Sequence, residues 1–135
     1  MFKLIRIENG RMNVPSPAYY EVTANEAVHE GEALVLSAGK LTKCAATTKP
    51  EFIAMGDKTA TAEDRKLGVV RCAANQIYEV EVSGTTAPTS LVPGAKIKLG
   101  GDGLTVVADT TSGVITVEDL NGAAAAGDTV IVRIV

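Results

Sequence analysis

Hydrophobic and polar residues alternate with a period of two along most of the chain, which is typical of short β-strands with one buried face. Residues 59–66 lack an apolar stripe and allow at most one helical turn. The sequence therefore predicts an all-β fold, a single small barrel or sandwich of short antiparallel strands. The strands are expected, between breaks rich in Gly, Pro, Asn and Asp, at residues 2–7, 19–23, 33–37, 40–45, 52–55, 67–73, 77–83, 96–99, 104–108, 114–120 and 129–135.

Two local features sharpen this prediction. Ala38-Gly39 separates two apolar runs and is expected to form a two-residue hairpin turn. Residues 130–135 are nearly all apolar, so the last strand is expected to be central in its sheet or covered by a neighbouring subunit.

An internal echo also favours paired strands. Residues 30–42 align without a gap on residues 93–105, and in both segments a Gly-led strand is reversed by a turn of small residues. The identical positions are Gly31 and Gly94, Leu36 and Leu99, Leu41 and Leu104, and Thr42 and Thr105. The echo fits two similar hairpins, and convergent turn chemistry explains it equally well.

Composition and charge bound the organisation of the chain. With 135 residues, 46% hydrophobic and 21% charged, one compact domain is expected. Residues 1–18 carry a charge of +2 and contain a Pro-bounded break, so they are expected to form an N-terminal arm on a β-rich body, residues 19–135, of charge −5. Such an arm either docks on an acidic partner surface or is a charged edge strand.

Few residues offer reactive chemistry. His29 is the single imidazole, and Cys44 and Cys72 are isolated, so they are expected to be reduced, buried thiols without a catalytic role. The segment Gly100–Gly103 leads into a strand rather than a helix and is expected to be a flexible hairpin rather than a phosphate-binding loop. No enzyme activity, metal or cofactor is predicted. The net charge of −3 argues against nucleic acid as a partner, and no apolar run is long enough to span a membrane.

The order of Gly-led strands resembles that of small decoration (cement) proteins of tailed bacteriophage capsids. The segments that carry the resemblance are Val28–Leu36, Phe52–Asp57, Pro93–Leu99 and Ala126–Ile134. The resemblance implies a non-enzymatic virion protein that is assembled in the host cytoplasm, binds the outer surface of the capsid and stabilises the shell, commonly as a homotrimer. Its partner would be the major capsid protein. The alternative is another phage structural module, such as a head fibre base or a tail-tube-associated protein.

In several proteins of this kind an N-terminal arm adds a strand to a capsid subunit. The resemblance therefore implies that the arm contains capsid-binding residues. These residues are Phe2, Lys3, Leu4, Ile5, Arg6, Ile7 and Arg11.

Overall fold

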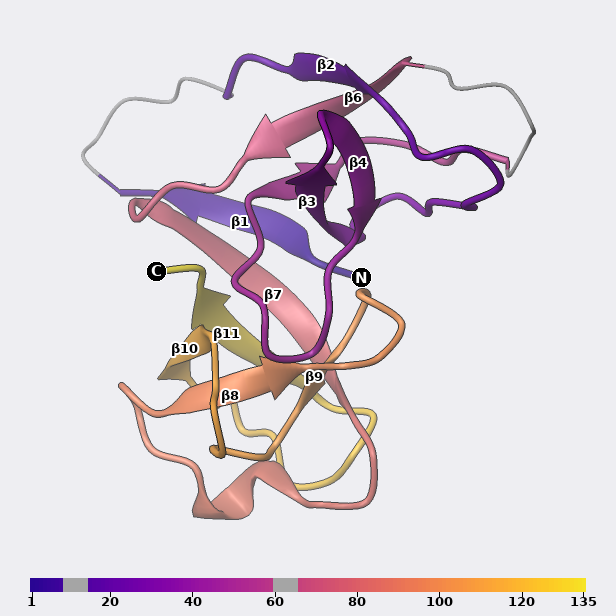
Figure 1. Cartoon of the computed structure of the whole chain (residues 1–135). Coiled ribbons are helices and arrows are strands. Elements are labelled where there is room, and N and C mark those ends of the chain that lie inside the picture. The colour runs from indigo at the N-terminus through magenta and orange to yellow at the C-terminus, as the bar shows by residue number, and fades with distance from the viewer. Residues whose placement is uncertain (9–14, 60–65) are drawn as a thin grey trace.

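The computed structural model describes residues 1–8, 15–59 and 66–135, and its ordered elements are almost all strands (Figure 1). The prediction of an all-β fold of short strands is confirmed. The strands are β1 (Lys3–Ile7), β2 (Ala18–Glu21), β3 (Ala33–Ser37), β4 (Lys40–Lys43), β5 (Phe52–Ala54), β6 (Lys66–Arg71), β7 (Gln76–Ser83), β8 (Lys96–Leu99), β9 (Val106–Val107), β10 (Ile115–Asp119) and β11 (Thr129–Arg133). A 3-10 turn, η1 (Pro88–Ser90), precedes β8, and the helical turn expected within 59–66 falls mainly on residues outside those described.

The strands form two sheets, and each sheet closes on itself. One sheet has the order β2-β6-β5-β3-β4, and a parallel bridge between Val22 and Leu41 joins its two ends. The other has the order β1-β7-β11-β10-β8-β9, and parallel pairing of Val82 with Val106 brings β9 back to β7. We call these units the N-barrel (β2–β6) and the C-barrel (β7–β11). A barrel was expected, and the structure has two, stacked one above the other in Figure 1.

The two barrels have the same topology. Strands β2, β3, β4, β5 and β6 occupy the positions of β7, β8, β9, β10 and β11, with antiparallel pairing throughout except at the parallel closure. Individual hydrogen bonds repeat as well. The N–H of Gly31 donates to the Ala54 carbonyl at 2.9 Å, and that of Gly94 donates to the Val117 carbonyl at 2.7 Å. The chain is therefore an internal structural duplication.

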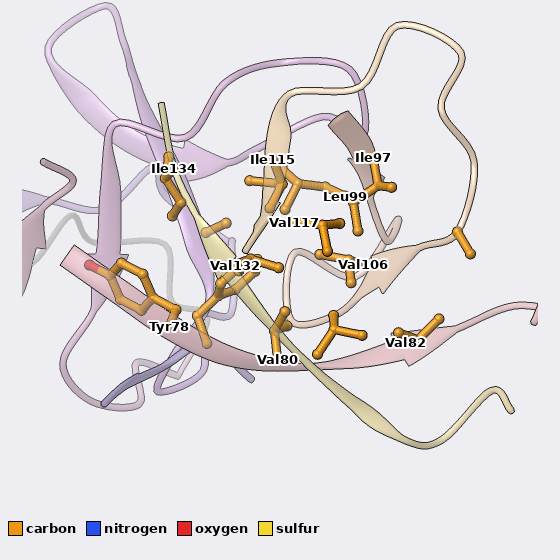
Figure 2. Packing of buried hydrophobic residues seen from close by; sticks show 14 of the residues in the cluster. Tyr78, Val80, Val82, Ile97, Leu99, Val106, Ile115, Val117, Val132 and Ile134 are labelled. Carbon is orange, nitrogen blue, oxygen red and sulfur yellow. The ribbon is translucent and has the colours of Figure 1, made fainter. Parts of the chain in front are cut away.

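Equivalent interior positions carry different apolar side chains of similar role. Figure 2 shows the C-barrel interior, in which side chains from five strands converge. The equivalent pairs, N-barrel residue first, are Val22 and Val82, Leu34 and Ile97, Leu41 and Val106, Phe52 and Ile115, Ala54 and Val117, Leu67 and Val130, and Val69 and Val132. All of these side chains are buried, and such burial of apolar area is the main stabilising term of each barrel.

The duplication corrects the register of the sequence echo. Gly31 and Gly94 are equivalent, and so are Leu36 and Leu99. Beyond them the alignment is wrong, because Leu41 is paired with Leu36 whereas Val106, not Leu104, is paired with Leu99. The C-barrel turn is two residues longer, so the shared Leu-Thr dipeptides are coincidental.

The barrels meet along a seam that the first strand helps to seal. Strand β1 pairs with β7, and the Phe2 ring packs edge-on against Tyr78 with ring centroids 6.2 Å apart. Two backbone hydrogen bonds cross the seam, from the Ala33 N–H to the Gly103 carbonyl at 2.8 Å and from the Leu99 N–H to the Ala46 carbonyl at 3.0 Å. One hydrophobic cluster therefore spans the C-barrel and the near face of the N-barrel.

Three further predictions can be compared with the structure. Ala38 and Gly39 have φ of 49° and 81° and connect β3 to β4, so the predicted hairpin turn is confirmed. Strand β11 lies between β7 and β10, which confirms the central position expected for the terminal strand. The segment Gly100–Gly103 connects β8 to the antiparallel strand β9, so the predicted hairpin is confirmed. Asp102 accepts hydrogen bonds from the N–H groups of Leu104 and Thr105, and Gly103 contacts the N-barrel.

Candidate interaction surface

The two cysteines, isolated in the sequence, belong to the same hydrophobic cluster, with Cys44 buried and Cys72 half-buried. His29 lies in an exposed loop, where its Nδ1 is 3.9 Å from the Asp57 carboxylate. Both cysteines are free, and burial raises the pKa of the Cys44 and Cys72 thiols to about 12. The Cys44 Sγ donates to the Thr48 carbonyl at 2.9 Å. Neutral thiols are weak nucleophiles, so this arrangement does not activate either cysteine at neutral pH.

Two kinds of feature were looked for among the described residues, a cluster of metal-ligating side chains and a membrane-spanning helix. No group of three or more His, Cys, Asp or Glu side chains is placed to hold a metal ion in these parts of the chain. Within the same residues no helix is long and apolar enough to cross a membrane.

The predicted capsid-binding residues that the structure describes, all except Arg11, lie in or beside β1, and their side chains face different surroundings. Phe2 is buried in the seam, and its N–H donates to the Gly31 carbonyl at 3.0 Å. Leu4 and Ile7 are half-buried, whereas Lys3, Ile5 and Arg6 are exposed. Arg11 lies outside the described residues. The role of this set stays a prediction, and only the exposed members have side chains free to meet a partner.

An ion-pair network fixes the end of β1 to the C-barrel. The Arg133 guanidinium donates to Glu8 Oε2 at 2.9 Å and to Glu118 Oε1 at 2.8 Å, and it also donates to the Ala74 carbonyl. These carboxylates hold the pKa of Arg133 above its usual value. Residues 3–8 are thus integrated into the chain's own fold over their whole length.

A charged residue is also buried at the seam. Glu32 is fully buried, and its Oε2 accepts the His29 N–H at 2.8 Å. Its Oε1 has no hydrogen-bond partner and lies 3.7 Å from the Lys43 Nζ. Burial raises the pKa of Glu32 because the charged form loses its hydration. The equivalent C-barrel residue is Ala95, so the buried charge is specific to the N-barrel.

Exposed apolar side chains lie close together on the outer face of the N-barrel. Tyr19 and Met55 are 63% and 46% exposed and lie on either side of Gly68, which has no side chain to separate them. Beside this row is a crevice of about 180 Å³ under Met1, which is itself 59% exposed. Its lining is mostly apolar and includes Met1, Leu4, Ile53 and Val70, with Lys3 and Glu30 at the rim. We call Tyr19, Gly68, Met55 and this crevice the apolar face.

Sequence reasoning did not find the apolar face. The adjacent residues Tyr19 and Tyr20 leave the orientation of β2 ambiguous, and Met55 was assigned to the end of a strand. A signal becomes visible only after the duplication is known: the equivalent of Tyr19 is Glu79, and the position of Met55 corresponds to the bulge of β10 at Glu118 and Asp119. The N-barrel therefore exposes apolar residues at positions where the C-barrel exposes carboxylates, and this difference indicates that the outer face of the N-barrel contacts something that the C-barrel face does not.

Among the described residues, fold and surface together define an all-β module built from two fused barrels, with exposed apolar side chains on the outer face of the N-barrel. Comparison with known proteins adds a structural likeness. No protein-family model matches the chain, and no curated protein matches it by sequence. The solved crystal structure of the head fiber gp8.5 N base in bacteriophage phi29 is similar in fold, with a TM-score of 0.58 and 17% sequence identity. The match covers 89% of this chain and 95% of that chain, so it includes both barrels.

Proposed function

We propose that this chain is a non-enzymatic structural protein of a phage virion that binds the outer surface of the capsid and stabilises the shell. The observation that carries the proposal is the two-barrel fold, which is similar over 89% of the chain to a phage head fibre base. The sequence resemblance to capsid decoration proteins points in the same direction. The partner in this proposal is the major capsid protein, and the chain acts without a cofactor.

The physical properties of the chain are compatible with a binding role. Each barrel closes its own sheet, so few strand edges are left open to unspecific pairing. Exposed apolar side chains are concentrated in the apolar face and at a few other positions, as expected of a protein that binds another protein surface.

A head fibre base is the second candidate, and the same structural likeness favours it. The two candidates differ in what binding does to the shell. A decoration protein holds neighbouring capsid subunits together and raises the temperature at which the head releases its DNA. A fibre base occupies the shell and leaves that temperature nearly unchanged.

The test uses purified heads that lack the protein, before and after expansion, with the full-length chain added back. Binding is measured by cosedimentation, and DNA release is followed with an intercalating dye during heating. Binding to expanded heads with a raised release temperature supports decoration, and binding without that rise supports a fibre base. Absence of binding to both kinds of head contradicts both proposals.

A further inference from the structure

The outer edge of β2 has no strand beside it before the bridge at Val22, among residues 1–8, 15–59 and 66–135. The same edge of β7, the equivalent strand of the C-barrel, is covered by β1. Lys3 of β1 lies opposite Glu79, and Tyr19 is the N-barrel equivalent of Glu79. The duplication therefore indicates that an edge of this kind can take an added strand. In Figure 1 β2 lies at the top of the molecule, away from the C-barrel.

Hydrogen bonds on the far side of β6 fix which backbone groups of β2 face outward. The Met55 N–H donates to the Gly68 carbonyl at 3.0 Å on the β5 side of β6, so the Val69 N–H, at the other side of that trans peptide, faces β2. Val69 lies opposite Ala18, so Ala18 exchanges hydrogen bonds with β6, and Tyr20, two residues further on, does the same. The backbone groups that alternate with these point to the open edge.

The open edge of β2 offers two donors and two acceptors. The donors are the N–H groups of Tyr19 and Glu21, and the acceptors are the carbonyls of Pro17 and Tyr19. Two groups are missing from this row. Pro17 has no N–H, and the Glu21 carbonyl is directed toward β4 by the parallel bridge in which the Thr23 N–H donates to the Leu41 carbonyl at 2.9 Å.

We propose that β2 of one copy pairs antiparallel with β2 of a second copy, about a two-fold axis at Tyr19. Tyr19 then lies opposite Tyr19 of the second copy, and the N–H of each donates to the carbonyl of the other. The Glu21 N–H of each copy donates to the Pro17 carbonyl of the other. Every outward donor meets an acceptor, and the N–H that Pro17 lacks would have faced the Glu21 carbonyl that β4 already engages. The edge is thus self-complementary, as a two-fold interface requires.

The side chains beside the edge are compatible with this pairing. A Cβ added at Gly68 would lie 3.3 Å from the Tyr19 Cε1, so the tyrosine ring leans over β6 and leaves the edge uncovered. Tyr19 is 63% exposed in the single chain, and the ring of the second copy covers part of this apolar surface. Glu21 lies opposite Pro17 of the second copy, so no like charges oppose each other. Pro17 also excludes partner strands that need a donor at its position.

This inference concerns only copies of this chain and is independent of the proposed function. Light scattering of the full-length protein between about 1 μM and 1 mM should show the mass rising from the 14.0 kDa of one chain to twice that value. A chain that stays monomeric over this range overturns the proposal. A trimer overturns it as well, because a two-fold contact does not close three copies.

A proline at position 19 tests the pairing. Tyr19→Pro removes the central donor of each copy but no N–H that faces β6, so the chain should fold and the dissociation constant of the dimer should rise roughly tenfold or more. Tyr19→Ala is the matched control, because it removes the ring and keeps the N–H, and it should weaken association less. Circular dichroism checks that both variants fold. Equal dissociation constants for the two variants would show that the backbone of β2 does not make the contact.

Hydrogen exchange of the wild-type chain, followed residue by residue by NMR, tests the same contact without a substitution. The N–H groups of Tyr19 and Glu21 should exchange quickly in dilute protein and slowly where the dimer predominates. The N–H groups of Ala18 and Tyr20, which face β6, are internal controls and should be protected at both concentrations. Fast exchange of Tyr19 and Glu21 in the dimer places the contact elsewhere and overturns the proposal.

Discussion

Where the N-barrel carries Tyr19, Gly68, Met55 and Val70 on its outer face, the C-barrel carries Glu79, Ile131, Glu118 and Arg133 at the equivalent positions. Inside, both barrels are filled with apolar side chains that are buried to a similar degree. The comparison shows that the interior and the exterior of the same topology are under different constraints. The interior is constrained by the need to fill a closed sheet, whereas the exterior differs with what each barrel must contact.

Their strand edges differ in the same way. Strand β1 covers the edge of β7, with Lys3 paired to Glu79. The corresponding edge of β2 has no strand beside it among the described residues, apart from the bridge at Val22. Pro17, which has no N–H to donate, directly precedes β2. One barrel therefore protects its edge with an added strand, and the other begins with a residue that discourages pairing.

The largest expected effect tests whether the two interiors are equivalent in energy. Phe52→Ala and Ile115→Ala remove fully buried side chains from equivalent positions. Each should lower the free energy of unfolding, by about 3–5 and about 2–5 kcal/mol, because a cavity is left in a closed barrel. Denaturant unfolding followed by circular dichroism measures both. If one variant lost less than about 1 kcal/mol, the barrels would not be equally packed.

A smaller effect is expected at the seam. Gly103 has φ of +70°, and a Cβ there would lie 3.1 Å from the Glu32 Cγ. Gly103→Ala should cost about 1–3 kcal/mol, the sum of left-handed backbone strain and crowding. Gly94→Ala is the matched control, because Gly94 also has a positive φ, of +91°, but has nothing within 4 Å of the added carbon. Equal losses in thermal unfolding for the two variants would mean that the approach of the barrels at Gly103 is not tight.

A third prediction concerns the difference between the outer faces. Arg133 is replaced with valine, the residue found at the equivalent N-barrel position, Val70, to test whether the ion-pair network stabilises the C-barrel. Arg133→Val removes the hydrogen bonds to Glu8, Glu118 and the Ala74 carbonyl, and we expect a loss of about 1–2 kcal/mol. Arg6→Gln is the control, since Arg6 is exposed and lies 3.8 Å from Glu8, at the limit of an ion pair. Hydrogen exchange should show faster exchange in β1 for the first variant only. Unchanged protection of β1 would show that the network does not hold this strand.

The smallest expected change is a slope of stability with pH. Because burial raises the pKa of Glu32 above its ordinary 4.5, the folded chain binds this proton more tightly than the unfolded chain. The stabilising contribution is therefore full below pH 4.5 and is lost as the pH rises through the raised value. Glu32→Gln should remove this slope, and Glu30→Gln, at an exposed neighbour, should retain it. Unfolding free energies measured across this range decide the point, and identical slopes in both variants would contradict it.

Much of the fold followed from local pattern. The alternation of apolar residues located the strands because each strand has one face in a barrel interior, and Ala38-Gly39 located a turn because both residues accept positive φ. Division into two barrels was not predictable from that pattern. The pairs that close each sheet, Val22 with Leu41 and Val82 with Val106, join strands that are not consecutive. No periodicity within one strand specifies such a partner.

The duplication was only partly visible in the sequence, because the two barrels share few identical residues. Gly31 and Gly94 are identical because each has a positive φ at the entry to a strand. Interior positions have diverged freely among apolar residues, as Phe52 and Ile115 show, because a closed sheet constrains volume more than identity. The apolar face could not be predicted from the sequence, because no local pattern determines which side chains stay exposed. Exposure of Tyr19 and Met55 depends on which neighbours cover them, and this is decided by the packing of the two barrels.

The pairing of β1 with β7 has a consequence for the order of events during synthesis. Residues 3–7 are made first, yet their partner residues, 76–79, follow only after the whole N-barrel has been translated. At typical elongation rates of about 5–20 residues per second, the first strand waits roughly 4–15 s for its partner. During that interval the N-barrel has every strand it needs to close, whereas Phe2 has no ring to pack against until Tyr78 is made. The first strand of the chain therefore finds its partner only after the five strands of the N-barrel have been made, and before the last four strands of the C-barrel.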